Sequence, residues 1–300
     1  MKKQTFIISI ITLAIIIIAG VILFFRQKEQ GDFYIDTAKI AKGKDFLLVD
    51  FNKDFFYQAI DQPESFKIKG HLRGAILPHH DLAADFIAKF FVQLAKNQTV
   101  DTFIILAPNH SDVAVWPAIS TKTYWQTELG PIYNQSEILD SLFASKKVFY
   151  DEDNFSAEHS IKVLLPFIQN YFPQATIVPI IMTSKHDLSM SRSLAKELSP
   201  YLEDKNTVVI SSLDFSHYLD LETAEKNDAI VLEAIKNKDY NLISNLNSDY
   251  LDSPPALITL LELMILVDSD DFELVDHSNS AYLLNNNFNT TSYLIGYFSN

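Results

Sequence analysis

The sequence has no cysteine, few glycines and a deficit of basic residues. Its 300 residues include no cysteine and only 7 glycines. The lack of cysteine excludes disulfides, thiolate metal sites and cysteine nucleophiles. A glycine-rich phosphate loop would be conspicuous in such a sequence, and none is present. The 38 acidic residues outnumber the 24 basic ones, which gives a formal net charge of −14. A nucleic-acid partner is therefore not expected, because a phosphate backbone requires a basic surface.

One long run without charge stands near the N-terminus. Thr5 to Phe25 contains no charged residue, and at helical rise it would span roughly 30 Å, enough to cross a bilayer core. A cleavable signal peptide has a shorter apolar core and ends in small residues, whereas this run ends in two phenylalanines. We therefore expect residues 1–28 to form a single-pass membrane anchor and residues 29–45 a tether. The lysines before the run favour an extracytoplasmic position for the soluble domain.

From residue 46 onwards, short apolar runs alternate with patterns of helical period. Continuous runs rich in Ile and Val predict buried strands at Gly74–Leu77, Thr102–Leu106, Thr176–Met182, Thr207–Ser211 and Tyr293–Phe298. Helical spacing predicts helices at Leu82–Lys96, Glu158–Tyr171, Leu188–Leu202, Glu222–Asn237 and Pro255–Val267. Alternation of this kind predicts that residues 46–300 form one α/β domain. We expect a three-layer sandwich with a mainly parallel central sheet.

Histidines follow three of the predicted strands. His79, His110 and His217 each come shortly after a strand ends, and ligands of open α/β sheets bind beyond the carboxyl ends of strands. A fourth, His159, lies near the start of a predicted helix. Imidazole is a frequent metal ligand and the usual general base. His80 remains an alternative to His79, because adjacent side chains diverge. The histidines at positions 71, 186 and 277 are expected to be hydrogen-bonded surface residues.

Four segments together resemble the Memo-like family, known in prokaryotes as AmmeMemoRadiSam system protein B. They read GAILPHHD, FIILAPNHSD, AEHSIKVLLPFIQNYFPQATIVPIIM and VVISSLDFSHY. The resemblance implies the fold of class III extradiol dioxygenases, which hold non-haem Fe(II) with two histidines and a carboxylate. It also implies that His79 and His110 are metal ligands. The Ser-Asp-x-x-His element of the family falls on Asp214 and His217, and its Glu-His-Ser element falls on Glu158 and His159.

The sequence departs from the family at the third ligand, which is a cysteine in Memo-like proteins. Here the corresponding region reads YLDSPPALITLLEL, with Leu251 or Asp252 at that position. Leucine cannot bind a metal, whereas Asp252 would complete a set of two histidines and one carboxylate, a known arrangement for Fe(II). Asp81, next to the first histidine pair, is a second candidate carboxylate.

The function that these residues favour is that of a membrane-anchored, metal-dependent oxidoreductase of dioxygenase type. His79, His110 and Asp252 would bind one divalent metal, Fe(II) first, with Zn or Mn as alternatives. His217, Asp214 and His159 would form the acid/base group that acts on a small-molecule substrate. Two alternatives remain open: a non-catalytic module that binds a metal or a ligand, and a metal-dependent hydrolase.

Overall fold

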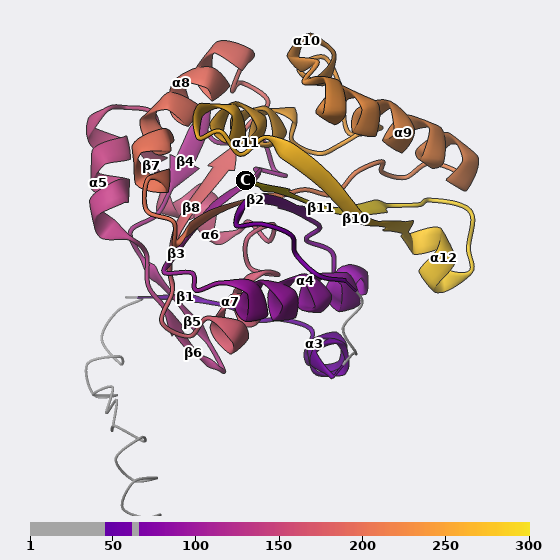
Figure 1. The fold of residues 1–300 in the computed structure, drawn as a ribbon, viewed down its shortest axis with the longest axis horizontal. Coiled ribbons are helices and arrows are strands. Elements are labelled where there is room, and N and C mark those ends of the chain that lie inside the picture. The colour runs from indigo at the N-terminus through magenta and orange to yellow at the C-terminus, as the bar shows by residue number, and fades with distance from the viewer. Residues whose placement is uncertain (1–45, 62–65) are drawn as a thin grey trace, which may run out of the picture. The chain divides into compact units, whose positions relative to one another are not determined.

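A mixed sheet of eight strands forms the centre of the protein in a computed structural model, which describes residues 46–61 and 66–300 (Figure 1). The strand order is β10-β11-β2-β9-β3-β8-β4-β7. The bounds are β2 (Leu72–Leu77), β3 (Thr102–Pro108), β4 (Ala118–Ser120), β7 (Phe149–Tyr150), β8 (Thr176–Met182), β9 (Thr207–Ser212), β10 (Asp271–Asn279) and β11 (Ser292–Ser299). A second sheet contains β1 (Phe46–Leu48), β5 (Tyr124–Thr127) and β6 (Gly130–Ile132).

The inner strands β2, β9, β3 and β8 are parallel to one another, as the sequence predicts. Antiparallel pairs occur towards both sides: β11 pairs with β2 and β10, and β4 pairs with β8. The central sheet is therefore mixed. The predicted strands are all present, but β10 was missed because its sequence, DFELVDHSN, is charged, half-exposed and interrupted by a register shift.

Helices cover both faces of the central sheet (Figure 1). One face packs on α4 (Ala84–Asn97) and α7 (Leu165–Tyr171), against which α3 (Lys53–Ile60) packs in turn. The other face packs on α5 (Ser136–Ala144), α8 (Leu188–Leu198), α9 (Leu221–Asn237) and α11 (Pro254–Leu266). The shorter helices are η1 (Asp81–Ala83), α6 (Glu152–Ser156), η2 (Ser199–Leu202), α10 (Tyr240–Ile243) and α12 (Ser280–Leu284). Alternate strand residues point to opposite cores: Ala75 and Leu77 lie in one, and Ile76 in the other.

One predicted helix is wrong over its first half. Glu158–Tyr171 was expected to be continuous, but α7 begins only at Leu165, and residues 160–164 form turns. The backbone N–H groups of His159 and Ser160 donate to the carboxylate of Glu158, and Pro166 stands in the first turn of α7, where proline is tolerated. His159 therefore lies in an irregular stretch directly before these turns rather than at the start of a helix.

The predicted anchor at residues 1–28 and the tether at 29–45 lie outside the described residues. Within the part of the chain that the structure describes, no helix is both long and apolar enough to span a bilayer.

Candidate metal centre

His79 follows β2 and is almost completely buried, with 2% of its surface exposed. Its backbone N–H donates to Asp214 Oδ1 at 3.1 Å, and its Nδ1 lies 3.2 Å from Ser212 Oγ. The Ser212 hydroxyl already donates its hydrogen to the carbonyl of Ser160 at 2.6 Å. Ser212 Oγ can therefore only accept from His79, so the proton resides on Nδ1. The other nitrogen, Nε2, is left to face the centre of the site.

His110 follows β3 and is oriented by Glu158. Glu158 Oε1 lies 2.8 Å from His110 Nδ1, and Oε2 accepts from the His110 backbone N–H at 2.7 Å. Burial raises the pKa of Glu158, but the hydrogen bond from His110 and donation from backbone N–H groups outweigh burial and lower the pKa to about 2. An ionised Glu158 accepts the proton of Nδ1 and leaves His110 Nε2 free, which is the usual support for a metal-binding histidine.

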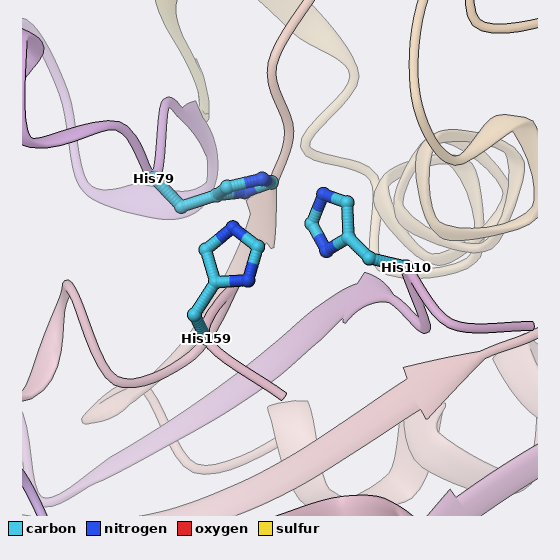
Figure 2. A group of neighbouring side chains, drawn as sticks. All are labelled: His79, His110 and His159. Carbon is cyan, nitrogen blue, oxygen red and sulfur yellow. The ribbon is translucent and has the colours of Figure 1, made fainter. Parts of the chain in front are cut away.

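His159 completes a group of three imidazoles (Figure 2). One ligand nitrogen from each of His79, His110 and His159 lies within 4.8 Å of the others, so the group could hold a metal ion. The rings of His110 and His159 are stacked at 4.3 Å. Burial, and then the nearby His110 and His79, lower the pKa of His159, which favours the neutral form that binds metals.

Two aspartates lie on the buried side of this group. Asp252 Oδ2 is 3.1 Å from His79 Nε2 and 3.8 Å from His110 Nε2. It also accepts the backbone N–H of Asp214 at 3.1 Å, while the Asp252 N–H donates to the Asp214 carbonyl at 3.2 Å. These two hydrogen bonds join the end of β9 to the residues before α11. The predicted carboxylate therefore reaches the histidines, although no strand precedes it.

A cation fits the donors that converge here. His79 Nε2 and Asp252 Oδ1 are both buried and make no hydrogen bond, although buried polar atoms normally have partners. Nε2 lies 3.1 Å from Asp252 Oδ2, so the two groups form an ion pair when Nε2 carries a proton. Among the described residues, the ion pairs of Asp214, Asp252 and Glu158 are all with histidines. Three buried carboxylates without a lysine or arginine partner would be stabilised by a positive ion.

The carboxylates also act on the charge of His79. Burial by itself lowers the pKa of His79, but attraction to Asp214 and then Asp252 outweighs burial and raises the pKa to about 9. Without a metal, His79 is thus protonated at neutral pH. A divalent ion would take the place of that proton on Nε2.

The remaining candidates lie elsewhere. His80 turns away from the group: its Nδ1 accepts the Leu82 N–H and caps η1. Asp81 is exposed and borders a shallow cavity with Phe51 and Asn52. His217 is half-buried, lies outside the group of three histidines, and packs on the ring of Tyr218.

Three further histidines were expected to be hydrogen-bonded at the surface, and one of them, His186, is not. His71 Nε2 contacts the Lys205 carbonyl at 2.6 Å, and His277 Nε2 pairs with Asp228 at 2.8 Å. His186 was expected at the surface, but it is only 4% exposed, and neither ring nitrogen makes a hydrogen bond.

Comparison with known proteins gives one family. The family model described as Memo-like protein matches residues 50–297. A MEMO1 family protein, MK0963, of Methanopyrus kandleri is 31% identical over 231 residues, which cover 74% of this chain and 81% of the relative. A MEMO1 family protein of Methanobrevibacter smithii is 31% identical and is covered over 77% of its length. A third, from Caldivirga maquilingensis, is 32% identical and covered over 61%.

Proposed function

Because the chain belongs to the Memo-like protein family, we propose that it is a membrane-anchored protein whose function depends on one divalent metal ion. The ligands in this proposal are the nitrogens of His79, His110 and His159 and a carboxylate oxygen of Asp252. His159, predicted from the sequence to be an acid/base residue, becomes a ligand instead. Asp214 then orients the site by holding both the His79 and the Asp252 backbones.

One observation carries the metal proposal: His79 Nε2 and Asp252 Oδ1 are buried without hydrogen-bond partners at the point where three histidines converge. The donors are nitrogen and oxygen only, which favours Fe(II), Zn or Mn over Cu(I). We place Fe(II) first, because histidines with a carboxylate and open coordination positions are the pattern of non-haem oxygenases. When bound, the ion would supply Lewis-acid and redox chemistry at a substrate oxygen.

Other residues of the chain would orient the ligands, leave access to the site and transfer a proton in this proposal. Glu158 fixes the ring of His110, and Ser212 fixes the ring of His79, so both Nε2 atoms are oriented in advance. The side chains of His110 and His159 are 32% and 58% exposed, so a small molecule can reach this side of the group. His217 would exchange a proton with that molecule as the general acid/base.

A non-catalytic metal-binding module is the second candidate. It is favoured by the position of His217, which lies outside the group of three histidines. Oxygen consumption by the Fe(II)-loaded protein, measured with phenolic compounds, separates the two. Turnover that is lost in His217→Gln while the metal is retained supports the oxidoreductase, whereas full metal loading without turnover supports the binding module.

Metal retention tests the site itself. Protein purified anaerobically and offered Fe(II), Mn(II) and Zn(II) should retain one ion per chain. His110→Ala should lose it, and His71→Ala should not, because His71 precedes β2 at the opposite end of that strand. Equal metal content in the wild type and in His110→Ala would reject the proposal.

The membrane attachment is tested separately. The full-length chain should sediment with membranes, resist carbonate extraction and require detergent for release, because residues 5–25 are long and apolar enough to span a bilayer. Recovery of the full chain in the soluble fraction without detergent would reject the anchor.

A further inference from the structure

An apolar surface is exposed around α12. Four large apolar side chains lie within seven residues here: Tyr282, Leu283, Leu284 and Phe288 are 61%, 45%, 58% and 73% exposed. Tyr218, which is 78% exposed, belongs to the neighbouring loop. The two segments are joined by hydrogen bonds from the Thr290 N–H to the Leu219 carbonyl at 2.8 Å and from the Leu221 N–H to the Asn287 carbonyl at 3.1 Å. We call these five side chains the α12 surface.

Four of the five side chains of the α12 surface lie in a segment without charge, whereas Tyr218 is followed by Asp220 and Glu222. Residues 278–300 contain no Asp, Glu, Lys, Arg or His. Charged residues make up 21% of the chain, so a segment of 23 residues would ordinarily contain about five. The exposed residues between the apolar side chains, at positions 285, 286, 287 and 289, are all asparagine. Exposed apolar side chains gathered in this way mark an interaction surface.

We propose that the α12 surface inserts into the interfacial region of the lipid bilayer to which residues 5–25 attach the chain. This inference rests on the membrane attachment proposed above. Two tyrosines, a phenylalanine and two leucines match the composition of interfacial anchors, in which aromatic rings sit at the level of the headgroups. The net charge of −14 would repel most of the protein surface from anionic lipids, whereas residues 278–300 add no repulsion of their own. The Tyr282 hydroxyl donates to the carboxylate of Glu225, which stands at the margin of the surface.

The surface and the histidine group lie at the same edge of the central sheet. β11 runs antiparallel to β2, with Gly296 opposite Ile76. The first residue of β11, Ser292, therefore lies beside the segment that follows β2, where His79 stands, and the rings of His80 and Tyr293 are 5.6 Å apart. Figure 1 shows α12, in yellow, next to the side of the sheet formed by β10 and β11. Docking would place the candidate metal centre close to the headgroups.

The absence of cysteine allows a direct test. Leu284→Cys and Phe288→Cys, made in the full-length chain, each give one labelling position for an environment-sensitive fluorophore. Leu266→Cys is the matched control: it is 44% exposed, and it lines a cavity with Arg73 and Asn300 at the opposite edge of the sheet. Each labelled protein is reconstituted into phosphatidylcholine vesicles with and without spin-labelled acyl chains.

Labels at positions 284 and 288 should be quenched at least two-fold more than the label at position 266, with emission shifted to the blue. Equal quenching at all three positions in vesicle-bound protein would overturn the docking surface and leave the anchor intact. Full-length protein that does not float with vesicles would overturn both. Disulfide formation between copies of Leu284→Cys in detergent without lipid, together with no lipid quenching, would assign the surface to a second copy of this chain instead.

Discussion

Glu158 holds His110 at two points, with one carboxylate oxygen on the backbone N–H and the other on the ring nitrogen Nδ1. The same carboxylate also accepts the backbone N–H groups of His159 and Ser160. A single buried side chain thus sets the position of two of the three histidines. Replacing Glu158 should therefore lower metal affinity more than the loss of one buried hydrogen bond would.

Glu158→Gln should lower metal affinity about 10–100-fold, because the neutral amide loses the charge that fixes the proton on His110 Nδ1. The protein should still fold, since glutamine keeps the size of the side chain. Competition with a chelator of known affinity measures the loss. Glu203→Gln, at an exposed position of the surface, is the control and should bind as the wild type does.

Asp252→Cys should give the site a thiolate ligand. Loaded with Co(II), this variant should show a near-ultraviolet sulfur-to-metal charge-transfer band that the wild type lacks, and its preference should move towards softer ions. Loss of the acceptor for the Asp214 N–H should cost stability by about 1–3 kcal/mol. Leu266→Cys adds a thiol far from the histidines and should give no such band. If the charge-transfer band is also absent in Asp252→Cys, residue 252 does not contact the metal.

Metal binding should strengthen as the pH rises towards 9. His79, with its pKa raised to about 9, is protonated below that pH, and the ion must displace the proton from Nε2. Affinity should therefore fall about tenfold for each pH unit below 9 through this one group. Calorimetry at pH 7 in buffers of different ionisation enthalpy should find about one proton released for His79. Release of no proton would place the ion away from His79.

In the metal-free protein the same shift has a consequence for stability. A pKa raised above the ordinary value of 6.5 means that the folded state binds the proton more tightly than the unfolded chain. The stabilisation from His79 is complete below pH 6.5 and is lost as the pH rises to about 9. Excess metal should abolish this loss at high pH, because the ion replaces the proton on Nε2, and urea unfolding at pH 6 and pH 9 can measure the change.

His186 should weaken the fold in acid. Burial lowers its pKa to about 4, so the unfolded chain takes up a proton between pH 6.5 and 4 that the folded state does not. His186→Leu should remove this loss. The free energy of unfolding of the variant, minus that of the wild type, should be about 2 kcal/mol larger at pH 4.5 than at pH 7. Urea unfolding at both pH values measures the gain. A difference between the two proteins that does not change with pH would contradict this assignment.

The sequence alone located the strands that matter for the site. β2, β3 and β9 are continuous apolar runs, buried on both faces, and their ends place His79, His110 and Asp214 at one edge. Asp252 was reached only through the family resemblance, because the residues before it form no strand. The place of His159 beside His79 and His110 was not predicted, since the helical spacing of Ile161, Leu164 and Leu165 concealed the turns that precede α7.

A carboxylate, rather than a thiolate, lies beside His79, and this affects how the site resists oxidation. Nitrogen and oxygen donors cannot be oxidised to sulfenic acid or joined in a disulfide, which are the reactions that inactivate thiolate sites in air. A chain without any cysteine has no other position for such damage. Oxidised glutathione should leave the metal-binding capacity of this protein intact, and a redox-inert ion such as Zn(II) should be removable and restorable in air.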